Sequence, residues 1–586
     1  MRNAVLVSAF ISHIAFLPML YGCTANGGNF AFTDANSASS TATDPTTDTD
    51  TTPNSNSLED LSGNTTDDNN LDSGSAVIDG DLNTVTSTTT ATQTATAIGP
   101  DETMFQDGLA LYKTADYNGA ITQFLLQIST YPGDLRADDA QLHIGKSYLK
   151  LLDYGTARAE LKKVKTAYPF SDTADNAQYW IGASYFDEML YDTAIVEFQK
   201  LLDTYPNSND RSDSQLGIAK SYYQKSEYTT AKAEFQKVLT YYPTSNDADS
   251  AQYYIGRCEH RLGNYDLARA AYTATITNYV SSTLADNAQY QIGNTYYDEG
   301  NYNMAKMKFQ ETITNYPYPL YDSGDGAQYY IGRSVHQELL ASAATDLAPA
   351  RLEYAKVNAT TYPASSMIDN AEYQIAKTYY DEANYDIAKY AQAKLAFQAV
   401  IDTYPFPQYD SGDGAQYYLG RSVQRELQAA AATDFNSARL EYAKINATNY
   451  PASGWIDNAQ FRIGQTYYIE GNWASALAEF TAILATYVGS DSIDDARYYS
   501  GRAKHKQLQY PEARSDYSLI LASCPGTSIY CDNAQYYTGM ALHAENFCAD
   551  EKIAWETFLT YYPASIYIGT AQTHFDSLNA GTHTCI

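Results

Sequence analysis

The sequence predicts an all-α protein, an α-solenoid of about twelve helix-turn-helix repeats of 37 to 44 residues each. A short string around Ala-Gln-Tyr recurs along the chain, and its first residue marks each repeat. This marker position is occupied by Ala140, Ala177, Ser214, Ala251, Ala288, Ala327, Ala371, Ala415, Ala459, Ala496, Ala534 and Ala571. Most intervals equal or nearly equal the one from Ala140 to Ala177, and the three longest lie between Ala327 and Ala459. Such a period is typical of stacked supersecondary units rather than of independent domains.

Residues 1–22 are predicted to be a lipoprotein-type signal peptide. Arg2 precedes an apolar stretch from Ala4 to Leu20, which suits the h-region of such a peptide. Leu20-Tyr21-Gly22-Cys23 resembles a bacterial lipobox, although Tyr21 departs from the small or aliphatic residue usual there. The resemblance implies lipidation of Cys23, which anchors a protein to the membrane, and sorting to the outer membrane of a bacterial envelope. A plain signal peptide with an incidental cysteine is the alternative.

Residues 23–100 are predicted to form a disordered tether. From Thr24 to Pro100 the chain is rich in Thr, Ser, Asp, Asn and Gly, with 11 acidic residues and no Lys or Arg. So little apolar surface does not offset the entropy lost on ordering. The tether would carry the folded part away from the membrane, or serve as a Thr-rich stalk for O-glycosylation.

One repeat shows the two helices of each unit. Apolar and small residues recur at helical spacing across residues 175–186, and Asp175 lies near the positive helix N-terminus. A turn at 188–192 leads to a second helical pattern at 193–202, which Tyr205-Pro206 should end because proline lacks an N–H group. The same Tyr-Pro pair recurs at Pro132, Pro169, Pro243, Pro317, Pro363, Pro405, Pro451 and Pro563.

These residues carry a family resemblance. Gly182, Tyr185, Ala194, Phe198 and Pro206 match the offsets of the tetratricopeptide (TPR) signature, and the match returns in phase over residues 101–580, leaving 581–586 as a tail. The resemblance implies a TPR solenoid that binds partners on the face lined by first helices. The long units and the lipobox are most similar to periplasmic TPR proteins, such as the Tol-Pal-associated cell division coordinator family and the BamD-like outer-membrane assembly lipoproteins.

A larger duplication lies near residues 316–491. The string from Tyr321 to Tyr330 recurs further along the chain as Tyr409 to Tyr418, which indicates that two units were copied as a block. Asp322 and Asp325 with their glycines invite a calcium-binding interpretation, but an EF-hand loop needs oxygen ligands at alternate positions and a distant Glu. We therefore expect capped helix starts.

The cysteines predict a stapled C-terminal end. Cys258 occupies a place held by Ser or Thr in other repeats, so we expect a small buried residue. Cys548 follows the marker Ala534 at the same interval at which Cys585 follows the marker Ala571. We hypothesise disulfides between Cys548 and Cys585 and between Cys524 and Cys531.

Composition and motifs exclude several function classes. The formal net charge of −32 and the pI near 4.5 argue against nucleic-acid binding. The sequence contains no GxSxG, HExxH, GxxxxGK[ST] or CxxCH motif, and the eight histidines show no ligand spacing. We therefore expect a non-enzymatic protein with no cofactor and no metal.

A row of basic residues is the candidate binding surface. Six positions after the marker, seven of eleven repeats carry a cation, and we call these the basic row: Lys146, Lys220, Arg257, Arg333, Lys377, Arg421 and Arg502. The row favours a groove for acidic or carboxylate-bearing peptide segments. One turn further on, Lys150, Arg261, Arg425 and Lys506 alternate with Asp187, Asp298 and Asp381, which favours an inter-repeat ion-pair ladder.

Tyrosines offer a second candidate surface. Tyr254, Tyr330 and Tyr418 follow the core aromatic of their unit and could face the groove, where tyrosine suits peptide or glycan recognition. Burial of both aromatics under a wide helix face is the alternative.

The sequence thus predicts a periplasmic, lipid-anchored scaffold that binds segments of envelope proteins, with roles in outer-membrane assembly or Tol-Pal and cell division as expectations. A self-associating surface protein that forms a layer or filament is one alternative. A carbohydrate-binding component of a polymer secretion or uptake system is another, and it depends on the tyrosines alone.

Overall fold

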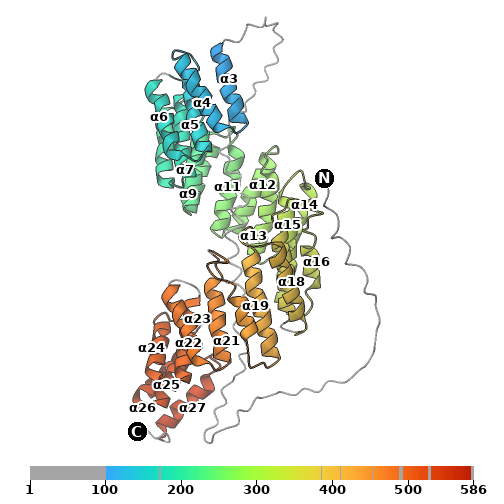
Figure 1. The fold of residues 1–586 in the computed structure, drawn as a ribbon, viewed down its shortest axis with the longest axis vertical. Coiled ribbons are helices and arrows are strands. Elements are labelled where there is room, and N and C mark those ends of the chain that lie inside the picture. Colours follow the sequence, from blue (N-terminus) through green and yellow to red (C-terminus); the bar gives the residue numbers. More distant parts are fainter. Residues whose placement is uncertain are drawn as a thin grey trace, which may run out of the picture. The chain divides into compact units, whose positions relative to one another are not determined.

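The computed structural model describes residues 100–168, 171, 173–383, 386–409, 411–451, 453–487, 492–524 and 530–581. These residues all lie in the second of two units of the chain, Thr92–Ile586. They form 25 helices and no strand, and Figure 1 shows the helices following one another along the chain. The all-α solenoid prediction is confirmed. The predicted signal peptide and nearly all of the tether lie outside the described residues.

The helices form twelve consecutive antiparallel pairs followed by a final helix. The pairs are α3 (Pro100–Lys113) with α4 (Tyr117–Thr130), α5 (Ala137–Lys150) with α6 (Tyr154–Ala167), α7 (Ala174–Asp187) with α8 (Tyr191–Thr204), α9 (Arg211–Gln224) with α10 (Tyr228–Tyr241), α11 (Ala248–Arg261) with α12 (Tyr265–Asn278), α13 (Ala285–Asp298) with α14 (Tyr302–Asn315), α15 (Ser323–Ala341) with α16 (Ala348–Tyr354), α17 (Ile368–Glu382) with α18 (Lys389–Thr403), α19 (Ser411–Ala429) with α20 (Asn436–Tyr442), α21 (Ile456–Ile469) with α22 (Trp473–Thr486), α23 (Ser492–Lys506) with α24 (Tyr510–Leu521) and α25 (Cys531–Ala544) with α26 (Cys548–Tyr561); α27 (Ile568–Asn579) is the last helix.

The recurrent Ala-Gln-Tyr string forms the contact between the two helices of a pair. In α7, Ala177 is completely buried. Gln178 donates from Nε2 to the backbone carbonyl of Glu197 in α8 at 3.0 Å and to its Oε2 at 2.9 Å. The ring of Tyr179 packs 5.8 Å from that of Phe198. The string therefore recurs because each of its side chains contacts the second helix.

Small residues in the first helix let the second helix approach closely. A Cβ atom added to Gly182 would lie 2.7 Å from Cδ1 of Phe198, and one added to Gly293 would lie 2.5 Å from Cε1 of Phe309. Both distances are shorter than a van der Waals contact, so glycine is the residue that fits.

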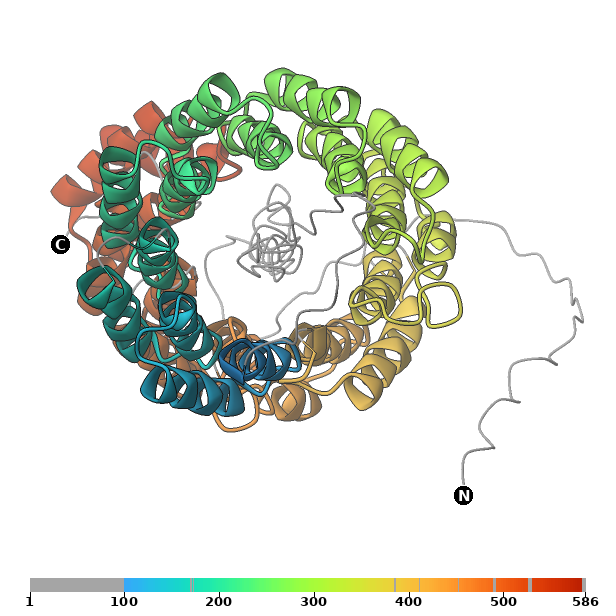
Figure 2. The same cartoon turned by 90° about the horizontal axis from the view of Figure 1, so that it is seen from above.

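Successive pairs are joined mainly by the second helix of one pair packing on the first helix of the next, as α8 packs on α9 and α14 on α15, and the first helices add further contacts. Odd-numbered helices contact the next odd-numbered helix, as α7 does with α9 and α13 with α15, and Figure 2 shows the pairs as two layers of helices. A serine before the first helix also donates to an aspartate of the preceding pair, as Ser282 does to Asp249 at 2.6 Å. The same bond recurs from Ser171 to Asp138, from Ser453 to Asp413 and from Ser565 to Asp532.

The longest repeats build their pairs differently. In the duplicated block, α15 and α19 have 19 residues each, and their partners α16 and α20 have only seven. These short helices end at Tyr354 and Tyr442, well before Pro363 and Pro451. The prediction that these two prolines end the second helix is therefore wrong. In the regular units it holds, because Tyr205 before Pro206 is the C-cap of α8.

Candidate functional site

The basic row lies along the first helices, where neighbouring pairs meet. Each of its seven cations lies over an aromatic ring of an adjacent pair. The contacts, from cation to ring centroid, are Lys146 to Trp180 at 4.7 Å, Lys220 to Tyr254 at 5.2 Å, Arg257 to Tyr223 at 5.0 Å, Arg333 to Tyr297 at 5.1 Å, Lys377 to Tyr418 at 4.8 Å, Arg421 to Tyr380 at 5.7 Å and Arg502 to Tyr537 at 4.1 Å. The row is therefore part of the contact between units.

Cation–π contacts of this kind fix the position of each charge. Arg502 also donates from Nη1 to the hydroxyl of Tyr498 at 2.8 Å. A cation over an aromatic ring is stabilised by about 0.5–2 kcal/mol. Because the cation keeps its charge, the arrangement places positive charges at a regular spacing along the first helices.

Burial divides the basic row into two groups. Lys146 is only 2 % exposed and Arg421 only 9 %, so these two side chains are the least accessible to a ligand in the groove, and their binding role stays a prediction. Their side chains fill the space between units. The other five cations are half-buried.

The tyrosines predicted as a second surface lie in the core. Tyr254, Tyr330 and Tyr418 are 6 %, 6 % and 3 % exposed. Each packs on an aromatic residue of the preceding unit, as Tyr254 does on Phe235 with ring centroids 5.2 Å apart. Tyr254, Tyr330 and Tyr418 are therefore buried, as the alternative of a wide helix face predicts, and these three residues give no support to an exposed tyrosine surface or to the carbohydrate-binding alternative.

The aspartates of the second row take part in contacts between units. Nε2 of His260 lies 2.8 Å from Oδ2 of Asp298. Asp381 bonds Lys377 of its own helix at 2.9 Å and lies 3.4 Å from Nε2 of His336. Burial raises the pKa of Asp187 to about 6, and the charge of Lys150 opposes this shift. The contacts between units thus use His260, which directly precedes the predicted Arg261, and His336, which precedes Gln337; neither histidine was part of the predicted ladder.

One predicted disulfide is present at the C-terminal end. Cys524 and Cys531 are bonded, with Cα atoms 5.9 Å apart, and Cys548 is also disulfide-bonded. Its predicted partner Cys585, like the predicted lipidation site Cys23, lies outside the described residues. Cys258 is free and buried, as expected.

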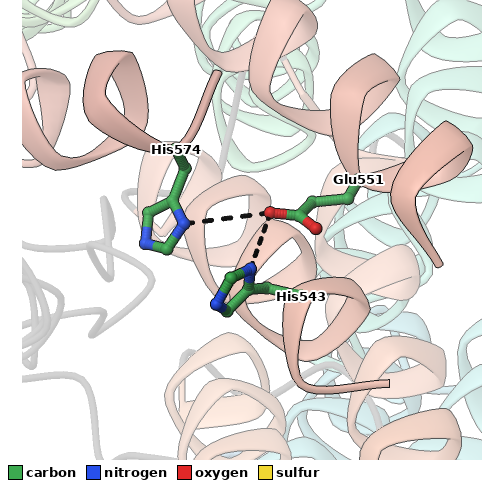
Figure 3. Close-up of side chains that lie close together, drawn as sticks. All are labelled: His543, Glu551 and His574. Carbon is green, nitrogen blue, oxygen red and sulfur yellow. Dashed lines mark hydrogen bonds and ion pairs between the residues drawn. The ribbon is translucent and has the colours of Figure 1, made fainter. Parts of the chain in front are cut away.

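Two histidines and a glutamate meet at the last three helices. Glu551 of α26 lies between His543 of α25 and His574 of α27, with both Nδ1 atoms turned toward its carboxylate (Figure 3). Nδ1 of His543 is 2.9 Å and Nδ1 of His574 is 3.8 Å from Oε1 of Glu551. The three ligand atoms all lie within 4.8 Å of one another, as in a group that could hold a metal ion. The spacing of the histidines along the sequence does not indicate this grouping, because its three residues lie on different helices.

Comparisons with known proteins agree with this architecture. A family model described as outer membrane lipoprotein matches residues 98–190 and 182–260, and a tetratricopeptide repeat model matches residues 250–282 and 287–317. The chain therefore contains tetratricopeptide repeats. This TPR chain resembles the outer-membrane lipoprotein family over its first four to five pairs.

Solved structures with some similarity are also TPR-like assemblies. A tetratricopeptide repeat protein from Parabacteroides merdae ATCC 43184 shares 14 % identity over 46 % of this chain and 96 % of its own, with a TM-score of 0.33. The APC/C hetero-tetramer Cut9-Hcn1 shares 12 % identity over 82 % of this chain and 97 % of the matched chain, with a TM-score of 0.31. A search of curated proteins gave no match. No helix among the described residues is long and apolar enough to cross a membrane.

Proposed function

We propose that this TPR chain is a non-enzymatic scaffold of a bacterial outer membrane that binds extended segments of partner proteins along its first helices. The family matches support a protein-interaction scaffold with an envelope location. Anchoring through lipidated Cys23, a periplasmic position, and a role in outer-membrane assembly or Tol-Pal-associated division are the finer parts of this proposal.

The observation that carries the proposal is the ordered spacing of positive charge in an otherwise acidic protein. Lys220, Arg257 and Arg333 are half-buried and each is held over a tyrosine ring. A cation that is already immobilised loses little conformational entropy when it binds a carboxylate. Acidic side chains or a C-terminal carboxylate of a partner are the groups that such cations bind.

The test compares two fourfold variants of the full chain in pull-downs from envelope extract. The first changes Lys220, Arg257, Arg333 and Arg502 to Gln. The control changes Lys163, Lys200, Lys237 and Lys444 to Gln, which are lysines in or directly after second helices with side chains about half exposed. Both variants remove four charges, and circular dichroism checks that both remain helical.

We expect the wild-type chain and the second-helix control to capture the same partner. The amount of this partner captured by the basic-row variant should be at least tenfold lower. Equal capture by all three chains would contradict the proposal. Sedimentation velocity across protein concentration distinguishes the self-association alternative, because concentration-dependent polymers with no captured partner would place the chain among structural proteins.

A further inference from the structure

The cluster of His543, Glu551 and His574 differs from the same place in every regular unit. Glu551 follows the marker Ala534 at the same interval at which Ala194 follows the marker Ala177. That place holds a completely buried alanine in seven other units: Ala157, Ala194, Ala231, Ala268, Ala305, Ala476 and Ala513. Glu551 is also completely buried. A carboxylate in place of a core methyl group costs stability unless a charged or metal partner compensates.

The two histidines occupy aromatic positions of the solenoid. His543 stands nine positions after its marker, where other units carry Tyr223, Tyr297, Tyr380 or Tyr468. His574 stands three positions after its marker, where others carry Tyr254, Tyr330, Tyr418, Tyr499 or Tyr537. Histidine itself stands at these two places in other units, as His260, His336 and His505 do at the first and His143 does at the second, so Glu551 is the departure from the regular units, and it meets two histidines. Each of these three side chains supplies an atom that can coordinate a metal.

The geometry fits a tetrahedral metal centre. Ligand atoms bound to Zn²⁺ at about 2.0–2.2 Å lie roughly 3.3 Å apart at tetrahedral angles. The two distances from the histidine Nδ1 atoms to Oε1 of Glu551, 2.9 and 3.8 Å, lie on either side of this value. Imidazole nitrogen with carboxylate oxygen suits Zn²⁺ and neighbouring first-row metals, whereas Ca²⁺ and Mg²⁺ prefer oxygen ligands.

Neighbouring groups orient these ligands. The indole N–H of Trp555 donates to Oε1 of Glu551 at 3.0 Å, and the Trp555 ring stacks on His574 with centroids 5.2 Å apart and planes 17° apart. Residues that contact metal ligands without binding the metal themselves typically fix the orientation of those ligands and tune their affinity for the metal. The side chains of His543 and His574 are 30 % and 18 % exposed, so solvent reaches the histidine side of the cluster and can supply a water ligand.

We propose that His543, Glu551 and His574 bind one first-row transition-metal ion, with Zn²⁺ as the best fit, and that the ion fastens α27 to the α25–α26 pair. The final helix has no second helix of its own among the described residues. A metal ion that joins α27 to the preceding pair compensates for the packing that a second helix provides in the other units. The site is independent of the basic row and of the partner that the row is proposed to bind.

The experiment titrates tag-free, EDTA-treated full chain with Zn²⁺ in a calorimeter and with Co²⁺ in a spectrophotometer. We expect one equivalent to bind with a micromolar or lower Kd, and Co²⁺ to give the visible d–d bands of a tetrahedral site. The variants E551A, H543Y and H574Y install residues that the chain uses at equivalent positions, so they are designed to preserve the fold. Each should weaken Zn²⁺ binding at least thirtyfold.

The matched control is H260Y, which removes a histidine at the position equivalent to His543 that faces Asp298. It should bind Zn²⁺ like the wild-type chain. Hydrogen exchange provides a second measurement: Zn²⁺ should slow exchange of the α27 amides in the wild-type chain and leave E551A unchanged. The absence of Zn²⁺ and Co²⁺ binding by the wild-type chain, or equal binding by E551A, would overturn the proposal and leave an ordinary ion-pair cluster.

Discussion

At the scale of single residues, the role of a side chain in this solenoid becomes clear when it is compared with the residues at equivalent positions of the other repeats. Gln178 recurs because its amide bonds the second helix of the pair, and Gln141 and Gln215 make the same contact. A residue that departs from the pattern is therefore informative. Glu551 is one such residue. Asp213 is another, because it replaces an asparagine found in the same place as Asn176 and Asn287.

Asp213 makes the stability of the solenoid depend on pH. Burial and, after it, the neighbouring carboxylates of Asp247 and Asp210 together raise the pKa of Asp213 to about 7. The folded chain therefore holds a proton that the unfolded chain releases near its ordinary pKa of 3.8. This stabilisation is complete below about pH 4 and is lost as the pH rises to about 7.

We predict that Asp213→Asn stabilises the protein above pH 7, by about 1–2 kcal/mol, and leaves it unchanged at pH 4. Melting temperatures measured from pH 4 to 8 check this, with the exposed Asp203→Asn as the control. A constant difference in melting temperature across the pH range would contradict the role assigned to Asp213.

At the scale of helices, the close approach within each pair depends on a residue without a side chain. We predict that Gly293→Ala destabilises the chain by about 1–3 kcal/mol, because the added methyl group would meet the ring of Phe309. The control is Gly454→Ala, whose Cβ would have no atom within 4 Å. Urea unfolding followed by circular dichroism measures both. Equal effects would refute the packing argument.

The turn between the two helices of a pair offers a substitution that should stabilise the chain, in contrast to Gly293→Ala. Met189 has a left-handed φ of 62°, whereas Gly263 and Gly300 occupy the equivalent turns with φ of 74° and 78°. A left-handed conformation costs a residue with a side chain about 1 kcal/mol. We predict that Met189→Gly raises the free energy of unfolding by about 0.5–1 kcal/mol in the same urea experiment, since the exposed Met189 side chain loses little packing. A loss of stability would contradict this interpretation.

The sequence predicted the helices well and the contacts between units poorly, for a physical reason. Helices and their stops depend on local periodicity and on residues such as Pro206, which the sequence displays directly. Contacts between units join residues that are far apart in the chain, such as Arg257 and Tyr223. The sequence does not show on which face of an aromatic ring a cation lies. The cluster at Glu551 was missed because its ligands come from three different helices, so their spacing along the chain matches no local metal-binding motif.

At the scale of the molecule, the side chains that we propose to bind a partner also take part in the contacts between units. Cations of the basic row stabilise the contacts between units through tyrosine rings, and the half-buried ones present their charge along the first helices. Removing one such charge is therefore expected to weaken both stability and binding. A test of binding must separate the two effects.

Photo-crosslinking tests the central claim most directly, because the crosslinking residue itself replaces no charge of the row. Asn294 of α13 occupies the place in the row between Arg257 and Arg333, and Met307 of α14 is exposed on the second helix of the same pair. We predict that a photoreactive amino acid at position 294 crosslinks a partner polypeptide in the envelope. The same residue at position 307 should not, and changing Arg257 and Arg333 to Gln should abolish the product. Equal crosslinking from both positions, or products formed only between copies of the chain, would contradict the scaffold proposal.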